Sequence, residues 1–408
     1  MRIPLMMALL LSLVSLITDL YIYFDLRNSL SRHKVWSRLY LAFACAGWIF
    51  LAYCLLAPRR DSDSGILFLM WGLYAYATVI IPKIIFCIFS WLGNLPRLWR
   101  RRPVKLGLSA GLPLGLIAFG AMWWGAAITR RQIDVVNVEI SSPRLPAAFD
   151  GYRMVQISDL HVGTWGEDTS FVAELVDSVN AQHPDIILFT GDIVNRESTE
   201  LAPFLNTLAR LHAPDGVYSI LGNHDYGDYV DWPSAADKRD NLQLLKNWQR
   251  QIGWKLLNNQ RTQIVHDNDT IQLIGVENWG EPPFHQYGHL IDAYPLSTDS
   301  LQHLNDDRFK ILLTHNPEHW RQEVRRISNI DLSLSGHTHA MQFELKFGNW
   351  RWSPSAWKYD QWGGLYDYIN AKGEKLQIYV NIGAGEVGIP SRIGATPELT
   401  VITLRKAP

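Results

Sequence analysis

The stretch LSLSGHTHAMQF, residues 332–343, ends a short apolar run with two histidines one residue apart. On an extended backbone, positions i and i+2 point the same way, so His337 and His339 can face one point in space. Gly336 lets the chain turn sharply as it leaves the expected strand. Histidine pairs at this spacing also occur by chance in loops, so the choice between a metal site and ordinary polar residues depends on the residue types at the ends of the other strands.

Polar side chains follow five short apolar runs, at the point where each run ends. They are Asp159 and His161 after 152–158, Asp192 after 185–189, Asn223, His224 and Asp225 after 216–221, His315 after 310–314, and His337 and His339 after 331–335. Ligand sites in α/β folds gather at the carboxyl ends of strands, so these side chains are expected at one edge. Further strands are expected over 270–276, 376–382 and 398–404, and helices over 169–182, 197–211, 241–252 and 317–327. This pattern predicts an α/β domain in which sheets pack between helices.

These residue types suit a dinuclear metal centre. Two divalent cations about 3.5–4 Å apart need a bridging carboxylate, with nitrogen and oxygen ligands on either flank. Carboxylate, amide oxygen and imidazole favour Mn, Fe or Zn. A thiolate site is excluded from the C-terminal part, because the three cysteines are Cys45, Cys54 and Cys87.

The series D-x-H, G-D, G-N-H-D, H and G-H-T-H resembles that of the calcineurin-like metallophosphoesterase superfamily. The tail YVNIGAGEVGIPSRIGATPELTVITL, residues 379–404, is similar to that of the branch called transmembrane protein with metallophosphoesterase domain. Bacterial relatives of this branch are often described as phosphohydrolases. The resemblance covers about residues 150–405 and implies a four-layer αββα sandwich, with two sheets face to face and helices outside.

The resemblance also implies roles by position. The first metal is held by Asp159, His161 and His339, Asp192 bridges, and the second metal is held by Asn223, His315 and His337. His224 is the general acid that protonates the leaving oxygen, and a hydroxide bridging the two metals attacks phosphorus in line. Asp225 is expected to support these residues. Arg392 stands where a phosphate clamp would be useful, although an exposed arginine is the more ordinary expectation. Many relatives have two glycines and a glutamine after the paired histidines, and Ala340 and Met341 here add bulk that can reshape substrate access.

The resemblance implies a metal-dependent phosphoric ester hydrolase, and a lipid-linked phosphoester or pyrophosphate is the preferred substrate. Similar relatives are associated with cleavage of a UDP-diacylglucosamine-type pyrophosphate, a reaction of the cytoplasmic face that conflicts with the extracytoplasmic orientation predicted from the loop cations. One alternative is a general extracytoplasmic phosphatase or phosphodiesterase of small molecules. Another is a membrane scaffold that binds metals without hydrolysis, although the complete ligand set with His224 speaks against it.

The N-terminal third contains four apolar stretches, about 4–24, 38–57, 65–85 and 106–127, each near the ~20 residues that cross a bilayer. The sequence therefore predicts four transmembrane helices within residues 1–130, a linker over 131–150, and the α/β domain over 151–408. Lys83 falls late in the third stretch, and it is expected to reach the interface from near a helix end.

The distribution of cations predicts the orientation in the membrane. One side carries Arg27, Arg32, Lys34, Arg38, Arg97, Arg100, Arg101, Arg102 and Lys105, and the other carries Arg2, Arg59, Arg60, Arg130 and Arg131. The positive-inside tendency places the first group in the cytoplasm. The chain is then a multi-pass protein of the bacterial cytoplasmic membrane with its catalytic domain outside.

Charge also limits the partners. Residues 1–131 hold 15 Lys and Arg against 4 Asp and Glu, a net charge of +11; the whole chain carries −1, so the remainder carries −12. An acidic domain of this kind argues against nucleic-acid binding, which needs a basic face. The segment 347–368 contains four tryptophans and three tyrosines. It is expected either as a hydrophobic cluster under a long loop or as a lid beside the metals that meets lipid or an apolar part of the substrate, which Trp165 could join.

Overall fold

The computed structural model describes residues 5–29, 34–56, 63–282, 285–294, 304–348 and 350–407. The chain divides into two compact units, residues 1–127 with 388–391, and residues 128–387 with 392–408. Arg2, Arg32, Arg59 and Arg60, which entered the charge comparison, lie outside the described residues.

The first unit is built from long apolar helices. They are α1 (Leu5–Ser29), α2 (Lys34–Leu56), α3 (Asp63–Asn94) and α4 (Leu112–Ala127), with a 3₁₀ helix η1 (Leu95–Trp99) and a π-helical turn η2 (Gly107–Gly111) between the last two. Four segments, Leu9–Arg27, Val35–Leu56, Gly65–Trp99 and Gly107–Arg131, are long and apolar enough to cross a membrane. The expectation of four membrane-spanning helices is confirmed, and α3 continues to Asn94 rather than ending near residue 85.

Lys83 turns toward other helices of this unit. Its Nζ lies 2.8 Å from Oδ1 of Asp19 on α1, and the side chains of this pair are 13% and 9% exposed. Tyr40 and Trp48 of α2 donate hydrogen bonds of 2.6 and 3.1 Å to the same carboxylate. The expectation that Lys83 reaches out to the interface is wrong, because Asp19 supplies an opposite charge within the helix group.

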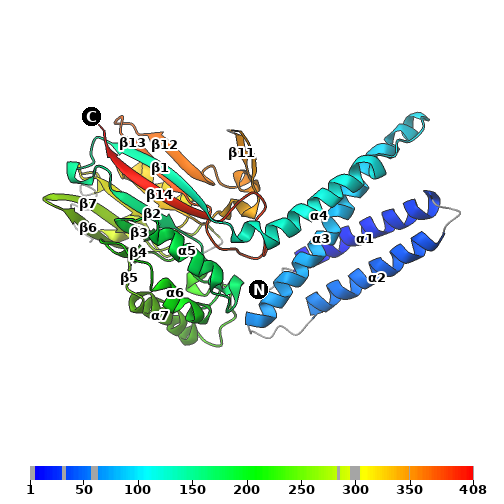
Figure 1. Cartoon of the computed structure of the whole chain (residues 1–408), viewed down its shortest axis with the longest axis horizontal. Helices are drawn as coiled ribbons and strands as arrows, with labels where there is room; N and C mark the ends of the chain where they lie inside the picture. Colours follow the sequence, from blue (N-terminus) through cyan, green and yellow to red (C-terminus); the bar gives the residue numbers. More distant parts are fainter. Residues whose placement is uncertain are drawn as a thin grey trace. The chain divides into compact units, whose positions relative to one another are not determined.

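The second unit contains two six-stranded sheets. The first has the order β1-β14-β2-β3-β4-β5, and the second has the order β12-β13-β9-β8-β7-β6. The strands of the first sheet are β1 (Asp134–Ser142), β14 (Glu398–Lys406), β2 (Arg153–Ile157), β3 (Ile186–Phe189), β4 (Val217–Ser219) and β5 (Trp254–Leu256). Those of the second are β12 (Gly364–Ile369), β13 (Lys375–Val380), β9 (Leu332–Ser335), β8 (Lys310–Leu313), β7 (Asp269–Gly275) and β6 (Gln260–His266). A separate hairpin pairs β10 (Leu345–Phe347) with β11 (Trp350–Trp352) (Figure 1).

Alternate residues of the central strands face two different hydrophobic clusters. Met154 of β2 and Leu188 of β3 belong to a cluster that also takes residues from β7, β8 and β9, so it lies between the two sheets. Val155 and Ile187, which are the sequence neighbours of Met154 and Leu188, belong to the cluster that includes α5 (Ser170–Asn180) and α7 (Ala235–Gln251). Strands covered on both faces become continuous apolar runs, as these sequences are. The expected sandwich of two sheets with outer helices is confirmed.

The parallel pairing brings the strand ends together. β2, β3 and β4 run parallel in register, and β8 runs parallel to β9. Their carboxyl ends therefore lie at the same edge of each sheet, and the next few residues of each chain segment enter the space beyond it. These are the residues that carry the expected metal ligands.

Three of the segments expected in the second unit differ in the structure. The expected linker over 131–150 contains β1, which pairs in parallel with β14 over nine residues on each strand. The helix expected over 197–211 is a 3₁₀ helix η6 (Ser198–Phe204) containing Pro203, followed by α6 (Leu205–Leu208). The helix over 317–327 is made of α9 (Pro317–His319), a π-helical segment η9 (Trp320–Val324) and α10 (Arg325–Ile327). The proline lacks the amide hydrogen that a regular α-helix requires, which accounts for the second case.

Candidate metal centre

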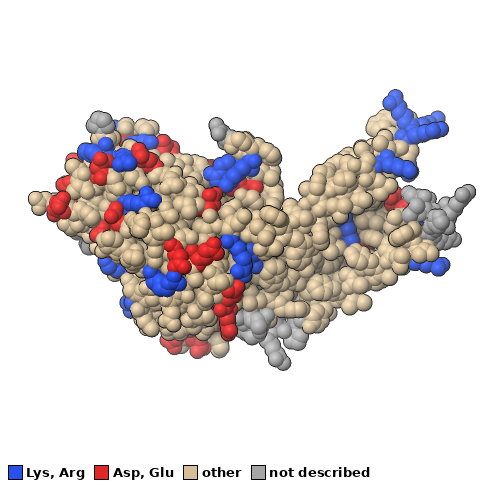
Figure 2. Space-filling model, in the orientation of Figure 1, with Lys and Arg blue, Asp and Glu red and all other residues tan. Residues whose placement is uncertain are grey.

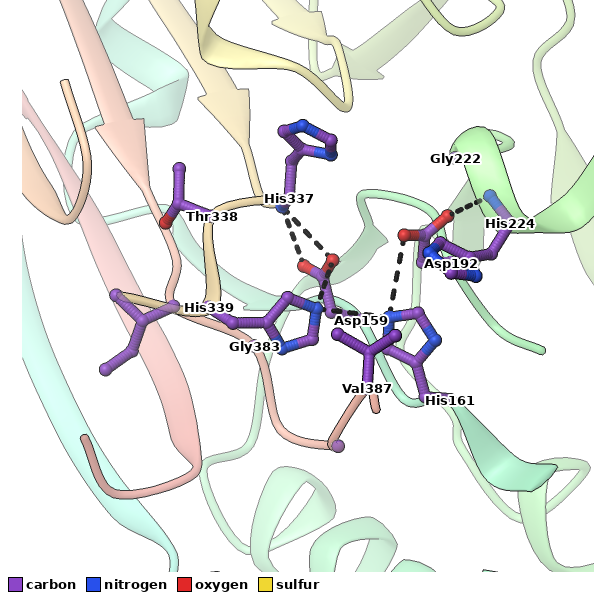
Figure 3. A network of polar contacts seen from close by, with 12 residues as sticks. Asp159, His161, Asp192, Gly222, His224, His337, Thr338, His339, Gly383 and Val387 are labelled. Atoms are coloured by element: carbon purple, nitrogen blue, oxygen red, sulfur yellow. Dashed lines mark hydrogen bonds and ion pairs between the residues drawn. The ribbon is translucent and has the colours of Figure 1, made fainter. Parts of the chain in front are cut away.

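Asp159, His161 and His339 form the first of two clusters of possible metal ligands. One ligand atom from each residue lies within 4.8 Å of the others. The Nε2 atoms of His161 and His339 are 3.1 Å apart, and Nε2 of His339 is 3.2 Å from Oδ1 of Asp159. All three side chains are buried and point toward one another (Figure 3).

Asp192, His315 and His337 form the second cluster. Nε2 of His315 lies 3.1 Å from Oδ2 of Asp192 and 3.2 Å from Nδ1 of His337. Oδ1 of Asn223 also lies 3.1 Å from Nε2 of His315. A carboxylate, an amide oxygen and two imidazoles therefore converge on one point.

Asp192 stands between the two clusters. Its Oδ2 atom is 3.5 Å from Nε2 of His161 and 3.1 Å from Nε2 of His315. Its Oδ1 accepts a 2.8 Å hydrogen bond from the backbone N–H of His224, which fixes the carboxylate plane. One oxygen thus faces ligands of both clusters, which is the position a bridging carboxylate occupies.

The donor set fits divalent cations. Ring nitrogens face ring nitrogens in both clusters, at 3.1 Å between His161 and His339 and at 3.2 Å between His315 and His337. Imidazole lone pairs aimed at a common point repel unless a cation or a proton lies among them. With two buried carboxylates beside them, nitrogen and oxygen donors of this kind suit Mn, Fe or Zn.

Several of the expected metal ligands share a strained, left-handed backbone conformation. Five expected ligands adopt positive φ angles, between 43° and 76°: Asp159, His161, Asp192, His337 and His339. Residues other than glycine rarely adopt this conformation, because it costs about 1–2 kcal/mol of conformational free energy per residue. Strain concentrated on ligand residues is typical of sites where geometry is imposed by the surrounding fold.

Two glycines make room for the carboxylates. A Cβ atom at Gly222 would lie 2.2 Å from Oδ1 of Asp192, and one at Gly336 would lie 2.2 Å from Oδ2 of Asp159. No side chain can be accommodated at such distances. The glycines of the G-N-H-D and G-H-T-H motifs are therefore required by the approach of the two acids.

The electrostatic environment prepares most of these groups for metal binding. Burial alone would raise the pKa of Asp159, but the facing His339 and His315 lower it below its usual range. Burial lowers the pKa of His337 to about 3 and holds that of His161 well below its ordinary value, so both rings are neutral. Burial also opposes protonation of His315, yet the adjacent Asp192 raises its pKa to about 9. A cation bound between His315 and Asp192 would take the place of that proton.

His224 lies beside the clusters without joining either. Its Nδ1 atom is 2.6 Å from the carbonyl oxygen of Asn195, so the ring donates its Nδ1–H there. The ring packs edge to face on His161, with centroids 4.8 Å apart, and stacks on Tyr229. Nε2 is the remaining atom that can carry a transferable proton.

Asp225 acts on the backbone of the Asp192 segment. It is fully buried and accepts hydrogen bonds of 2.9, 2.9 and 2.8 Å from the N–H groups of Asp192, Ile193 and Gly222. Burial and the nearby Asp192 raise its pKa to about 7. Its contacts hold the turn that presents Asp192, whereas the side chain of His224 is held by Asn195.

Arg392 does not match the expectation of an exposed arginine. It is fully buried and donates to the carbonyl oxygens of Gly385, Ala395 and Ile382, and one nitrogen lies 3.3 Å from Nδ1 of His339. Burial lowers its pKa to about 10. A guanidinium occupied by three carbonyls organises the loop behind His339 and has few donors left for a phosphate.

The residues after His339 lie differently from one another. Ala340 is fully buried with Tyr359 and Trp362, whereas Met341 is 47% exposed. Of the two side chains that were expected to add bulk near the site, only that of Met341 reaches solvent, and that of Ala340 is packed inside. Trp165 stacks on Phe171 of α5 in the domain core, so it does not belong to the aromatic segment.

Three residues near the clusters were not singled out from the sequence: Asn195, Tyr229 and Tyr359, the last of which belongs to the aromatic segment 347–368. Tyr359 is 2.9 Å from Nε2 of His337, and Tyr229 accepts a 2.8 Å hydrogen bond from the side-chain amide of Asn223. Asn195 comes three residues after Asp192, so its nearness to the G-D motif in the sequence could have indicated that it lies at the site. The tyrosines carry no such signal, because only the tertiary fold brings Tyr359 to His337.

Comparison with known proteins agrees with this arrangement. Residues 152–341 match the family model described as calcineurin-like phosphoesterase. Residues 1–130 match the model described as probable calcineurin-like phosphoesterase, transmembrane domain.

Relatives of several kinds are similar over most of the chain. The "uncharacterized metallophosphoesterase YkuE" of Bacillus subtilis is 29% identical over 311 residues, which cover 75% of this chain and 97% of the relative. The "transmembrane protein with metallophosphoesterase domain" of Danio rerio is 29% identical over 343 residues, covering 81% and 72%. The "UDP-2,3-diacylglucosamine pyrophosphatase LpxG" of Chlamydia trachomatis is 28% identical over 289 residues, covering 60% and 82%.

Both parts of the chain thus agree with one family: the apolar helices match its transmembrane domain, and the two ligand clusters lie within the residues of its phosphoesterase domain. The chain belongs to the calcineurin-like metallophosphoesterases and carries the four-helix transmembrane domain at its N-terminus.

Proposed function

We propose that this chain is a membrane-anchored, dinuclear metal-dependent phosphohydrolase that cleaves phosphoester or pyrophosphate bonds in lipid-linked molecules. The observation that carries the proposal is the position of Asp192, whose single oxygen Oδ2 faces His161 of one cluster and His315 of the other. A carboxylate shared in this way serves two cations at once, and hydrolysis of phosphoesters is the chemistry for which paired cations are suited.

The residues divide the work between them. Asp159, His161 and His339 would hold one cation, Asn223, His315 and His337 would hold the other, and Asp192 stands between the two sets. When bound, the cations activate water and offset the charge that builds on the phosphoryl oxygens. His224, fixed by its hydrogen bond to Asn195, delivers a proton from Nε2 to the leaving oxygen.

Two observations support a lipid-linked substrate. The chain has four helices that can cross a membrane, which keeps the domain near lipid headgroups. A relative 28% identical is named as a pyrophosphatase of UDP-2,3-diacylglucosamine, a nucleotide-linked lipid. The count of loop cations supports an extracytoplasmic catalytic domain in the cytoplasmic membrane, where phospholipid or other lipid-linked phosphates are the accessible class.

The first experiment is hydrolysis of bis(p-nitrophenyl) phosphate by the detergent-solubilised full chain with added Mn²⁺, beside Asp192→Asn. The amide keeps the shape of the side chain and removes the charge shared by the two clusters. We expect the variant to lose at least 100-fold in turnover and to bind fewer than two metals per chain by elemental analysis. His212→Ala, a change at an exposed histidine away from both clusters, is the matched control and should keep wild-type turnover.

The outcomes separate the competing functions. Equal turnover of wild type and Asp192→Asn would contradict the dinuclear mechanism. Two bound metals with no hydrolysis of any phosphoester would favour a metal-binding scaffold. Equal efficiency on soluble phosphodiesters and on lipid-linked ones would favour a general phosphatase of small molecules.

A further inference from the structure

The segment Leu345–Lys358, called here the aromatic apron, exposes large aromatic side chains to solvent. Phe347 is 69% exposed, Trp350 52% and Trp357 80%. Single exposed apolar side chains are common on proteins, but three large aromatic ones within eleven residues form a patch that favours a partner. In Figure 1, the β11 end of the apron stands apart from both sheets.

The apron carries positive charge on an acidic domain. Its sequence contains Lys346, Arg351 and Lys358 and no aspartate or glutamate, whereas residues 132–408 as a whole carry −12. All three cations are exposed, and Figure 2 shows Lys and Arg side chains gathered where the hairpin lies in Figure 1. The buried Glu344, just before the apron, pairs with Arg351 at 2.5 Å and with Lys346 at 3.5 Å. An anionic surface that approaches this patch is therefore attracted by exposed cations, whereas the acidic domain as a whole repels it.

The inner side of the apron is bonded to the loop that carries the metal ligands His337 and His339. Ser353 donates a 2.5 Å hydrogen bond to the carbonyl of Ala340, and Ser355 donates one of 3.3 Å to the carbonyl of Thr338. Both serines are fully buried. The outer aromatic face is therefore held rigidly against the metal-binding loop, and a surface that binds the apron is brought to the metal centre.

We propose that the aromatic apron docks on a lipid bilayer that contains anionic headgroups. Tryptophan favours the boundary between headgroups and acyl chains, phenylalanine adds an apolar side chain that can be buried there, and lysine and arginine are attracted to an anionic leaflet. The bilayer is favoured over a protein partner because the fourth candidate span ends at Arg131 and β1 begins at Asp134, so the chain itself keeps this domain within reach of lipid. The consequence for catalysis, delivery of lipid-linked substrates, rests on the proposed function; the docking itself does not.

Depth measurement in nanodiscs tests the docking without any assay of activity. The full chain is made with Cys45, Cys54 and Cys87 replaced by alanine, and a spin label is attached through Ala356→Cys, an exposed position beside Trp357. Ala236→Cys on α7, also exposed, is the matched control. We expect the label at 356 to be at least twofold more accessible to oxygen than to a water-soluble nickel reagent in discs containing phosphatidylglycerol. The control label at 236 should stay more accessible to the nickel reagent, as in water. Addition of 1 M salt should return the accessibilities of the label at 356 to those of the control.

A water-like label at 356 in anionic discs would overturn the proposal. A second measurement keeps the native cysteines: Trp357 is replaced by p-benzoylphenylalanine in the membrane-embedded chain, which is then irradiated. A covalent lipid adduct, found by mass spectrometry, supports docking on the bilayer. An adduct to another protein without a lipid adduct overturns it.

Activity then separates the two proposals. The double substitution Trp350→Ser with Trp357→Ser should raise KM at least tenfold for a lipid-linked phosphoester in anionic vesicles and leave hydrolysis of bis(p-nitrophenyl) phosphate unchanged. If the wild type hydrolyses neither substrate while the label at 356 is immersed, the proposed function fails and the docking stands.

Discussion

The hydroxyl of Tyr359 lies 2.9 Å from Nε2 of His337, on the opposite side of the ring from Nδ1, which faces His315 at 3.2 Å. For Nδ1 to keep its lone pair for a cation in the second cluster, the ring must carry its hydrogen on Nε2 and donate it to the hydroxyl of Tyr359. Partners of this kind fix the orientation of a metal-binding histidine and raise its basicity.

Removal of that hydroxyl should weaken metal binding. We expect Tyr359→Phe to raise the Mn²⁺ concentration for half-saturation by about 10–100-fold, the usual effect of losing such a partner. Titration of metal-stripped protein by calorimetry measures this directly. Tyr368→Phe, at a partly exposed tyrosine of β12, is the control and should bind as the wild type does. An unchanged titration of Tyr359→Phe would mean that the fold alone orients His337.

His224→Ala should separate metal binding from proton transfer. Because His224 belongs to neither ligand cluster, both metals should still bind. Turnover of an alkyl phosphodiester should fall by about 10²–10⁴-fold, the usual contribution of a general acid, whereas a p-nitrophenyl ester, whose leaving group needs no proton, should lose far less. Equal losses on the two substrates would argue against the assignment of His224.

Glu386 should make the stability of the domain depend on pH. It is fully buried and pairs with Arg130 at 3.0 Å, and burial, which Arg130 only partly opposes, raises its pKa to about 7. A carboxyl group with a raised pKa binds its proton more tightly in the folded state, so folding is stabilised below pH 4.5 and loses that stabilisation as the pH rises to 7.

Between pH 4.5 and pH 7, the free energy of unfolding should fall by at most roughly 3 kcal/mol through Glu386. Thermal unfolding of the solubilised chain should therefore show a smaller fall in Tm for Glu386→Gln than for the wild type over pH 4.5–7. Parallel pH profiles of the two proteins would rule out this role for Glu386.

The pair Asp19–Lys83 should stabilise the membrane unit as a pair rather than as two separate residues. Lys83→Met leaves a carboxylate without its counter-charge, and loss of one partner from a buried pair costs about 3–5 kcal/mol. The double variant Asp19→Asn with Lys83→Met removes both charges and should recover much of the loss. Tm and yield in detergent measure the coupling, and additive effects of the single changes would show that the two charges act independently.

The side of the membrane can be tested with single cysteines. Lys372→Cys lies in an exposed turn of the catalytic domain, and Arg101→Cys lies in the loop before α4. With the native cysteines replaced by alanine, a membrane-impermeant maleimide should label position 372 in spheroplasts and position 101 only after permeabilisation. The reverse labelling would place the catalytic domain in the cytoplasm.

The strands that lead to the site could be predicted because each is a short apolar run followed by a polar motif. All eight expected strands, from 152–158 to 398–404, occur in the structure. β1 could not be predicted, since it is largely exposed at the edge of its sheet and lacks an apolar run. The short strands β10 and β11 share that difficulty, because their aromatic residues face solvent.

Long-range partners account for the rest. The burial of Arg392 depends on carbonyl groups at 382, 385 and 395 that a turn of the chain brings together. The inward position of Lys83 depends on Asp19, 64 residues earlier. Neither relation has a local pattern in the sequence, so composition and spacing alone favoured the ordinary exposed positions.

The pairing of β1 with β14 sets the order of events during biosynthesis. β14 lies between β1 and β2, so β1 has no strand to pair with in the first sheet until residues 398–406 have been made. The four apolar helices leave the ribosome long before that point and can insert while the remainder is still being synthesised. A chain that stops short of residue 398 therefore leaves an anchored membrane protein whose attached domain is unfinished, and such a product exposes the apolar faces that quality-control proteases recognise.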